Sequence, residues 1–597
     1  MNPTNDTMMI AIEAAATTKT RCEYPRPDFK RNEWLNLNGI WSFEFDDMNC
    51  GEKEKWYGNK DFSRKINVPF PYQSELSTIN SKEIHHYLWY RRQFEFPAHW
   101  MGKRILLKFG AVDFYTKLWV NGCYIGNHSG GYSSFTFDIT ENLQNVNTIV
   151  LKVEDQHFDK NQPRGKQMWM AEPFGCWYKG FSGIWQTVWL EAVEETYIES
   201  FKIIPDIDQR KVALEVDFNR FSENQELSID IGFQSEAICS LKQTIGGKTV
   251  KLEINIESPR FEWNGIRLWS PETPNLYDIE LKVWEREKCL DRVQSYFGMR
   301  KVSREGNRFL LNNIPYYQKL ILDQGYYDKG WITAENEEAL KNDIEVVKQM
   351  GFNGVRKHQK IEEPLFLYWC DRLGLIVWEE MPSFYQYGDT SIRHLVQEWP
   401  EIIKRDYNHP SVVTWVPFNE SWGVMELQHS LEQQTAVKSI YYLTKTLDKT
   451  RPVIDNDGWE HTDTDICTIH DYEQDGKKLS EVYSNQDRVL AGAPSTMFPR
   501  YVFARGYRYN NQPVLISEFG GIAFSGVEGW GYGSGVKNEE EFIQRLTGLF
   551  QAIQKNQYFC GYCYTQLTDV EHEKNGLLTF ERKTKISPEI IKRLNTF

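Results

Sequence analysis

The sequence predicts a multidomain protein in which an N-terminal jelly-roll β-sandwich and an immunoglobulin-like β-sandwich precede a C-terminal (β/α)8 barrel. Residues 24–300 contain short runs of alternating apolar and polar residues between turn signals, a pattern typical of antiparallel sandwiches. After residue 300, apolar strand-like runs alternate with amphipathic helical segments, which is typical of a parallel barrel. A chain of 597 residues is long enough for roughly three or four domains.

The first sandwich is expected over residues 24–195. Residues 35–45 alternate apolar and polar side chains. Residues 118–126 consist of two β-rich runs around an Asn-Gly pair, which is a strong hairpin signal. Short strands at regular spacing predict a jelly roll or a related sandwich.

The second sandwich is expected over residues 196–300. Residues 211–218 alternate cleanly, and residues 268–277 form a proline-punctuated loop before a strand at 278–283. About 100 residues with this pattern fit an immunoglobulin-like sandwich.

The barrel is expected over residues 301–597, because strand-like and helix-like segments follow each other in strict order. The expected helices are residues 335–350, 364–373, 394–407 and 427–447, and the expected strands are residues 351–356, 375–379, 412–416 and 514–518.

Composition limits the function classes. The formal net charge of −14 argues against a general nucleic-acid or anionic-membrane binder, which would need a basic face. No run of about 18 apolar residues occurs, so no membrane-spanning helix is expected. Aromatic residues make up 14% of the chain, which suits large β cores and rings that stack on sugars equally well. Homo-oligomerisation is left open.

The ends and the cysteines point to a cytoplasmic protein. Residues 1–23 are expected to be a disordered leader, because their short apolar stretch carries Glu13 and lacks a basic segment, unlike a signal peptide. The 10 cysteines are scattered, so reduced thiols are expected. Cys560 and Cys563 have C-x-x-C spacing, but no second Cys or His pair accompanies them, so no zinc site is expected.

Two apolar strands end in a glutamate. Residues 412–416 lead to Glu420, and residues 514–517 lead to Glu518. A buried carboxylate is costly unless it is paired or used, and barrels keep their chemistry at the C-terminal ends of the strands. Two carboxyls in one barrel mouth are what cleavage of a glycosidic bond needs. The alternative is that each glutamate is an ion-paired strand end; Glu379 and Glu380 compete for the same role.

With these residues identified, the chain resembles glycoside hydrolase family 2, the family of β-galactosidases, β-glucuronidases and β-mannosidases. The resemblance runs from about Arg26 to the C-terminus. The matching motifs are residues 37–41, 120–122, 130–132 and 182–185 in the first sandwich, 269–271 through 297–298 in the second, and 353–356 and 419–420 in the barrel.

The resemblance implies roles for the strand-end residues. Glu420 is expected to be the acid/base, Glu518 the nucleophile, and Asn419 the residue that binds the 2-hydroxyl of the sugar in the −1 subsite. Net retention follows from a covalent glycosyl-enzyme. The chemistry agrees, because a nucleophile must stay ionised while a general acid needs a raised pKa.

Further pocket members are expected around this pair. Arg356 is expected to keep the nucleophile ionised, Tyr472 to hydrogen-bond it, His470 to line the pocket and Trp530 to form a sugar platform. For Arg356 the alternative is an ordinary salt bridge, and for His470 and Tyr472 it is a core position.

Departures from the family limit the substrate prediction. The family pattern after the arginine is x-Ser-His-x-Pro, whereas residues 356–360 read Arg-Lys-His-Gln-Lys. His358 is therefore displaced by one position, Lys360 is a candidate contact for an acidic sugar, and Asp323 is a candidate ligand for sugar hydroxyls.

Two elements of some family members are not recognised in this sequence, one for binding a uronic acid and one for binding magnesium. The Asn-x-Lys-Gly element of β-glucuronidases is not found after Glu518, which argues against that activity. The magnesium site of some large β-galactosidases is not recognised after Glu380, so neither a catalytic metal nor another cofactor is expected.

The sequence thus predicts an exo-acting, retaining β-glycosidase of the β-galactosidase type. The expected partner is a glycoside or oligosaccharide, with a neutral hexopyranose or L-arabinopyranose as the −1 sugar, and neither nucleic acid nor membrane. The alternatives are a glycosidase for another sugar, including β-glucosides, β-mannosides and uronides, a transglycosylase, or a non-catalytic carbohydrate-binding protein.

Overall fold

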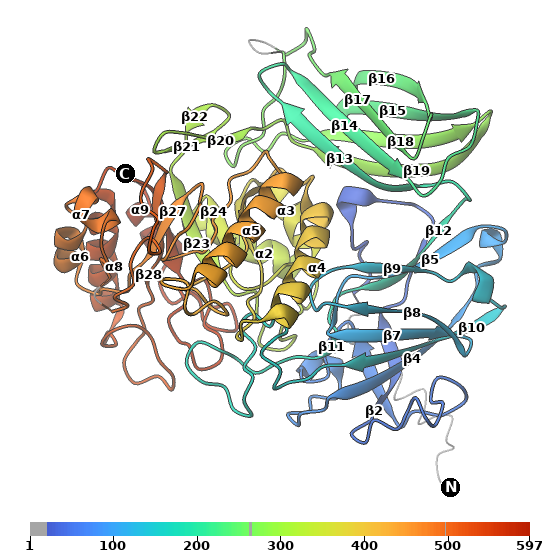
Figure 1. The fold of residues 1–597 in the computed structure, drawn as a ribbon, viewed down its shortest axis with the longest axis horizontal. Coiled ribbons are helices and arrows are strands. Elements are labelled where there is room, and N and C mark those ends of the chain that lie inside the picture. The colour runs from blue at the N-terminus through green and yellow to red at the C-terminus, as the bar shows by residue number, and fades with distance from the viewer. Residues whose placement is uncertain (1–20, 262–264, 496, 597) are drawn as a thin grey trace.

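The predicted order of two sandwiches and a barrel is confirmed by a computed structural model, which describes residues 21–596 apart from 262–264 and 496. Figure 1 shows the barrel on the left and the two sandwiches stacked beside it on the right. Most of the predicted leader, residues 1–20, lies outside the described residues. Arg21, however, is 2% exposed and forms a salt bridge of 2.7 Å with Glu363 of the barrel, so the packed chain begins before the expected residue 24.

The first sandwich consists of a six-stranded and a four-stranded antiparallel sheet around a shared apolar core. The larger sheet contains β3 (Arg64–Val68), β2 (Gly39–Phe45), β4 (Tyr87–Glu95), β10 (Val146–Glu154), β7 (Tyr115–Val120) and β8 (Cys123–Ser129). The smaller contains β1 (Trp34–Asn36), β12 (Val188–Val193), β5 (Arg104–Phe109) and β9 (Phe135–Asp138). Strands β7 and β8 form the predicted hairpin, in which Asn121 and Gly122 both have positive φ, as a tight turn requires.

The second sandwich packs a three-stranded sheet against a four-stranded one. The sheets contain β13 (Ile198–Asp206), β14 (Lys211–Phe218) and β17 (Thr249–Asn255), and β16 (Glu236–Thr244), β15 (Gln225–Phe233), β18 (Tyr277–Glu285) and β19 (Lys288–Phe297). Every second residue of β14 is buried, which confirms the strand predicted from its alternation.

The barrel contains seven parallel strands in the order β26-β25-β24-β23-β29-β28-β27. They are β23 (Gln318–Asp323), β24 (Gly354–Lys357), β25 (Ile376–Glu380), β26 (Val412–Val416), β27 (Cys467–His470), β28 (Val514–Gly520) and β29 (Phe559–Thr565). Residues 453–457 fill the eighth position, because Ile454 and Asp457 donate backbone hydrogen bonds to the β26 side and the His470 N–H bonds to Gly458 on the other.

Helices surround the barrel. They are α2 (Glu337–Gln349), α3 (Pro364–Leu373), α4 (Asp389–Asp406), α5 (Leu431–Leu447), α6 (Gly476–Val482), α7 (Gln486–Leu490), α8 (Glu539–Gln554) and α9 (Pro588–Leu594). The four helices predicted from periodicity correspond to α2, α3, α4 and α5, whereas α6 to α9 were not predicted. The expected helix from residue 427 begins instead at Leu431, because the Ser430 side chain caps its N-terminus. Among the described helices, none combines the length and apolar character needed to cross a bilayer.

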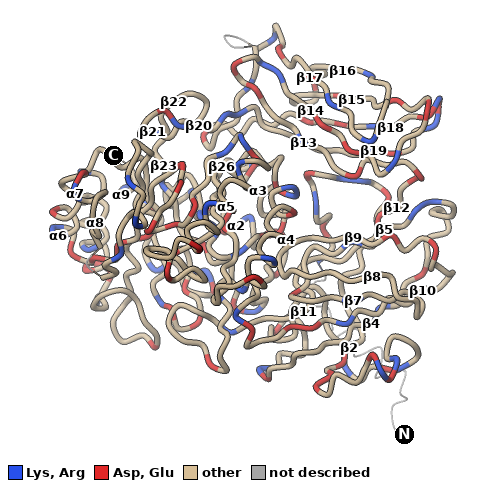
Figure 2. The backbone as a smooth tube through the Cα atoms, in the orientation of Figure 1, with Lys and Arg blue, Asp and Glu red and all other residues tan. Residues whose placement is uncertain are grey.

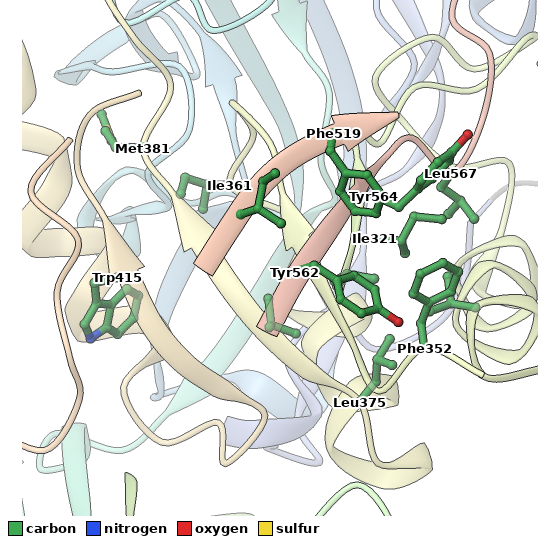
Figure 3. Close-up of a cluster of buried hydrophobic side chains, with 14 of the residues drawn as sticks. Ile321, Phe352, Ile361, Leu375, Met381, Trp415, Phe519, Tyr562, Tyr564 and Leu567 are labelled. Atoms are coloured by element: carbon green, nitrogen blue, oxygen red, sulfur yellow. The ribbon is translucent and has the colours of Figure 1, made fainter. Parts of the chain in front are cut away.

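Side-chain alternation along the strands decides what faces the barrel interior. Leu320 and Leu322 of β23 pack inside, whereas Ile321 packs against the helices in the cluster of Figure 3. By the same alternation, Arg356 and Glu380 point inward. A small antiparallel sheet of β20 (Val302–Glu305), β21 (Arg308–Leu311) and β22 (Ile314–Pro315) contributes side chains to the same interior cluster.

A long connection of the first sandwich reaches the barrel. Residues 155–182, here named the strap, join β10 to the short strand β11 (Gly183–Ile184), which pairs with β6 (Val112–Asp113). The backbone N–H groups of Arg164 and Gly165 donate to the Ser383 carbonyl at 2.8 and 3.0 Å. The strap thereby brings sandwich residues to the C-terminal ends of the barrel strands (Figure 1).

Charged residues are spread over all three domains. Figure 2 shows acidic and basic residues interspersed along the tube in the sandwiches and the barrel. Buried ion pairs also cross domain boundaries: Arg31 lies 2.8 Å from both Glu191 of the first sandwich and Asp291 of the second. All ten cysteines, each within the described residues, are free thiols.

Candidate active site

Glu420 and Glu518 meet at the C-terminal mouth of the barrel. Their carboxylate oxygens and a nitrogen of His470 all lie within 4.8 Å of one another. The two carboxyl side chains are 14% and 6% exposed, so the pair is almost enclosed by protein. A separation of this order leaves room for an anomeric carbon between the two groups.

Backbone irregularities aim both glutamates into the mouth. The register of β28 shifts between Ile516 and Phe519, which both face the helices, so the bulge turns Glu518 inward. Glu420 follows the end of β26 and has a φ of 51°, a left-handed conformation that a residue with a Cβ adopts at some cost.

Positive charge and a hydroxyl surround Glu518. The Arg356 guanidinium donates to one carboxylate oxygen at 2.7 Å, and the Tyr472 hydroxyl donates a short hydrogen bond to the other. Burial alone would raise the pKa of Glu518, but the charges of His470 and Arg356 outweigh it and hold the pKa below its ordinary value. Glu518 is therefore ionised and suited to nucleophilic attack.

Glu420 experiences the opposite environment. Burial raises the pKa of its carboxyl, and the negative charge of Glu518 raises it further. His470 Nδ1 lies 2.8 Å from a Glu420 oxygen and acts against this shift without reversing it. A carboxyl with a raised pKa beside an ionised one is the arrangement that lets the first donate a proton.

His470 is a buried cation that links the pair to Asp457. Its Nε2 lies 2.9 Å from Asp457 Oδ2. Burial would lower the pKa of His470, but the charges of Glu518 and Asp457 raise it to about 10. Both ring nitrogens of His470 therefore face carboxylates, and the ring atoms and the oxygens of Glu420 and Glu518 lie at distances that would also fit a metal ion.

Arg356 connects the nucleophile to Asn419. Besides Glu518, the guanidinium bonds Glu380 and Asp457 at 2.7 and 2.9 Å, and it donates to Asn419 Oδ1 at 2.7 Å. The amide Nδ2 of Asn419 is buried and has no hydrogen-bond partner. A buried donor without a partner is costly unless a ligand supplies the acceptor, so the Asn419 Nδ2 group is a free donor for a ligand in the mouth.

Two other predicted pocket residues lie near the pair. His358 Nδ1 is 2.9 Å from Glu380, and burial together with the Arg356 charge lowers the pKa of this histidine, so it is neutral. Trp530 is separated from Tyr472 by Tyr532. Trp530 packs edge-on against the Tyr532 ring, and the Tyr532 ring stacks on Tyr472 with 3.4 Å between the ring centroids.

Two predicted contacts with sugar need correction. Asp323 and Lys360 lie outside the barrel interior, because alternation along β23 places Asp323 on the same face as Ile321. Asp323 pairs with Lys357 at 2.8 Å, and Lys360 pairs with Glu362 at 2.8 Å. Each is at most 2% exposed, so both belong to a buried ion-pair network behind the strands and do not line the mouth.

The residues near the pair that were not predicted include Asp457, Trp422 and Lys166. Asp457 follows the apolar residues 453–454, a strand-end pattern like the one before Glu420 that could have identified it. Trp422 packs at 6.0 Å from the His358 ring. Lys166 belongs to the strap, and no local pattern in the sequence signals its position.

One large surface hollow among the described residues lies away from the carboxylates. A hollow of about 1240 Å³ lies between α6 and α8 and is lined by polar residues such as Asp475, Lys477 and Arg545. The glutamate pair, and not this hollow, therefore identifies the site.

Two sandwiches and a barrel that holds a buried glutamate pair at this spacing form the architecture of a multidomain glycoside hydrolase. Models for "Glycosyl hydrolases family 2" match residues 35–191 (sugar binding domain), 196–300 and 333–593 (TIM barrel domain). The chain belongs to glycosyl hydrolases family 2.

Similar proteins carry several activities in their names. A beta-galactosidase of Thermoanaerobacter pseudethanolicus is 26% identical over 76% of this chain, which spans only 57% of that protein's length. A beta-glucuronidase of Felis catus is 23% identical over 94% of the chain and 90% of its own length.

Solved structures share the fold of the whole chain. A GH2 beta-galacturonidase from Eisenbergiella tayi superposes with a TM-score of 0.74, 19% identity and coverage of 96% of this chain and 98% of its own. A beta-glucuronidase from Ruminococcus gnavus gives a TM-score of 0.78 and 19% identity over 97% of this chain and 100% of its own.

Proposed function

We propose that this protein is an exo-acting, retaining β-glycosidase that uses Glu518 as nucleophile and Glu420 as acid/base. The observation that carries the proposal is the electrostatic asymmetry of two adjacent carboxyls: Arg356, His470 and Tyr472 favour the charged form of Glu518, whereas burial and the Glu518 charge favour the neutral form of Glu420.

In the first step, the Glu518 carboxylate attacks the anomeric carbon while Glu420 gives its proton to the glycosidic oxygen. The bond to the leaving group breaks and a glycosyl ester on Glu518 forms. Asn419, held by Arg356, donates from Nδ2 to the adjacent sugar hydroxyl, and this contact orients the ring for attack.

In the second step, Glu420 acts as a base. Esterification removes the negative charge of Glu518, which had raised the pKa of Glu420, and the His470 cation remains 2.8 Å away. The pKa of Glu420 therefore falls in the intermediate, and its carboxylate can take a proton from a water. This water attacks the anomeric carbon, the bond from that carbon to the Glu518 oxygen breaks, and the sugar and the Glu518 carboxylate are released. Two inversions at one carbon give net retention.

Burial of the pair supports action at a chain end. The reacting carboxyl side chains are 14% and 6% exposed, and the strap covers part of the mouth. A terminal sugar can enter such a site, whereas an internal bond of a polysaccharide would need an open groove on both sides.

The proposed −1 sugar is a β-galactoside or the configurationally similar α-L-arabinopyranoside. The similarity to a beta-galactosidase supports it, while the similarities to beta-glucuronidases make a uronide the second candidate. A transglycosylase would use the same residues and differ in its acceptor.

A panel of p-nitrophenyl glycosides tests the proposal, with β-galactoside, β-glucoside, β-mannoside, β-glucuronide and α-L-arabinopyranoside as substrates. Wild type should cleave at least one, and Glu518→Ala should lower its turnover by at least about 10⁴-fold, because no other group can form the ester. Equal turnover by Glu518→Ala would refute the nucleophile, and a folded wild type that binds but cleaves none of them would indicate a carbohydrate-binding protein.

A further inference from the structure

Lys166 is a buried lysine that the strap places in the mouth of the barrel. The residue is 4% exposed. Its ammonium lies 5.1 Å from the centroid of the Trp422 ring and 5.7 Å from that of Tyr178. Trp422 comes two residues after Glu420, and Tyr178 donates to Glu573 at 2.6 Å. The Lys166 ammonium therefore lies near Trp422, which follows Glu420, and near Tyr178, which is hydrogen-bonded to Glu573 of the barrel.

The Lys166 ammonium lacks the carboxylate partner that other buried lysines of this protein have. Lys357 and Lys360 each lie 2.8 Å from Glu362. In the part of the chain that the structure describes, Lys166 forms no such salt bridge. Burial lowers the pKa of the ammonium, but Cys176, Glu573 and the two site glutamates raise it above the ordinary value. Cys176, whose own thiol pKa is raised to about 12, is a neutral hydrogen-bond partner of Lys166. A buried ammonium has three donors to satisfy, and water alone is a poor substitute in a confined site.

Two more buried donors near the pair also lack partners. Asn419 Nδ2 and Trp459 Nε1 have none among the described residues, and the Trp459 ring packs 5.6 Å from His470. Two unsatisfied donors and an ammonium without a carboxylate partner, all around one carboxyl pair, match a ligand that is rich in acceptor oxygens, as a sugar is.

The strap is docked firmly on both sides of Lys166. Gly165, the preceding residue, has a φ of +58°, and a Cβ there would meet the Gln359 carbonyl at 2.3 Å. On the other side, Trp177 Nε1 donates to the Tyr385 hydroxyl at 2.7 Å and Trp530 Nε1 donates to the Gly175 carbonyl at 2.9 Å. The position of the lysine is thus set by contacts with the barrel.

We propose that Lys166 is a specificity-determining residue of the active site, whose ammonium binds an acceptor oxygen of the sugar held against Glu518. That oxygen is either a hydroxyl of a neutral sugar or the carboxylate of a uronic acid, and the carboxylate gains more from the contact because both partners are charged. The inference rests on the proposed function, and it makes the first sandwich part of the catalytic site.

Lys166→Met tests the proposal, since it keeps most of the side-chain volume and removes the donors. We expect kcat/KM on the best neutral glycoside to fall at least tenfold, and on a β-glucuronide or β-galacturonide at least a hundredfold if a carboxylate is the partner. Lys179→Met is the matched control: Lys179 is on the same strap, but its side chain is 44% exposed and pairs with Glu571, and its removal should leave kcat/KM unchanged.

A ratio of two activities distinguishes a lost sugar contact from a loss of folded protein. The ratio of kcat/KM for a uronide and a neutral glycoside, measured on one preparation, does not depend on the folded fraction. Lys166→Arg should restore part of the loss because it keeps the charge. If Lys166→Met shows wild-type kcat/KM and wild-type ratios on every substrate, the inference is wrong while the proposed function stands. If Glu518→Ala retains turnover, the proposed function fails independently of the lysine result.

Discussion

At the scale of single residues, the chemistry of the site depends on which carboxyl is surrounded by donors. Glu518 accepts from Arg356 and Tyr472 and lies 3.6 Å from His470, whereas Glu420 contacts His470 alone among these. Each donor to a carboxylate favours its ionised form, so the asymmetry in contacts becomes an asymmetry in pKa. The roles proposed for the two glutamates thus follow from their neighbours.

Tyr472→Phe should move the acid limb of the activity profile. The hydroxyl lowers the pKa of Glu518, and its loss should raise that pKa. Because activity needs ionised Glu518, the rise of kcat/KM with pH should occur at higher pH than in wild type. A hydrogen bond to a charged group is worth about 1.5–3 kcal/mol, so the midpoint should shift by about one to two pH units and activity below it should fall about tenfold or more.

The measurement is kcat/KM against pH on the best aryl glycoside, for both proteins. Tyr532→Phe is a suitable control, because the Tyr532 ring stacks on Tyr472 and, within the described part of the chain, its hydroxyl forms no hydrogen bond with Glu518. An acid limb that stays in place in Tyr472→Phe would mean that this hydroxyl does not tune the nucleophile.

At the scale of elements, the strap and the barrel strands cooperate. The strap follows the last strand of one sheet of the first sandwich, and it makes no regular strand of its own beyond the single bridge between Gln167 and Tyr178. The strap donates hydrogen bonds to Ser383 and Tyr385, which belong to the loop after β25. An irregular segment fixed in this way acts as a rigid wall of the site.

Gly165→Ala should displace this wall. The residue has a positive φ, which costs an alanine about 1 kcal/mol, and its Cβ would meet the Gln359 carbonyl at 2.3 Å. The strap must move, so we expect kcat/KM to fall at least tenfold while thermal unfolding changes little. Gly102→Ala is the control: its φ of +85° imposes similar strain, but no atom lies within 4 Å of the new Cβ. Unchanged activity in Gly165→Ala would show that the strap is only a passive cover.

Strand alternation explains what the sequence could predict and what it could not. The glutamate pair, Asn419, Arg356, His470 and Tyr472 were predictable because each follows or lies at a strand end or matches a family motif. The inward turn of Glu518 was not, because a bulge reverses the simple alternation.

Long-range contacts account for the remaining differences. Asp323 and Lys360 were misplaced because polar strand-end residues can face either the mouth or the helices, and only the packing of Phe366 and the ion pairs around Glu362 selects the outer face. Lys166 was missed because the sandwich and the barrel meet only in the folded chain.

At the scale of the whole molecule, buried charges join the domains. Arg31 links the two sandwiches through Glu191 and Asp291, and Glu398 of α4 links the barrel to the first sandwich. Such groups stabilise the assembly only while their protonation states match their surroundings. The interface between sandwich and barrel should therefore depend on pH.

Glu398→Gln should remove a part of that pH dependence. The carboxyl is 1% exposed and accepts from the N–H groups of Tyr132 and Ser133 at 2.9 and 3.2 Å, yet burial raises its pKa from 4.5 to about 7. Because the pKa of Glu398 is higher in the folded protein, the protonated carboxyl stabilises the folded state. This stabilisation is fully present below about pH 4.5 and is lost as the pH rises through about 7. The difference corresponds to on the order of 3 kcal/mol.

Wild type should therefore unfold at a lower temperature at pH 8.5 than at pH 5.5, and this difference should shrink in Glu398→Gln, whose amide does not titrate. Other titrating groups contribute equally to both proteins, so the comparison isolates Glu398. Glu401→Gln on the exposed face of the same helix serves as the control and should keep the wild-type difference. If calorimetry gives Glu398→Gln the same dependence on pH as wild type, the carboxyl does not titrate in this range and the charge at the interface is compensated by another group.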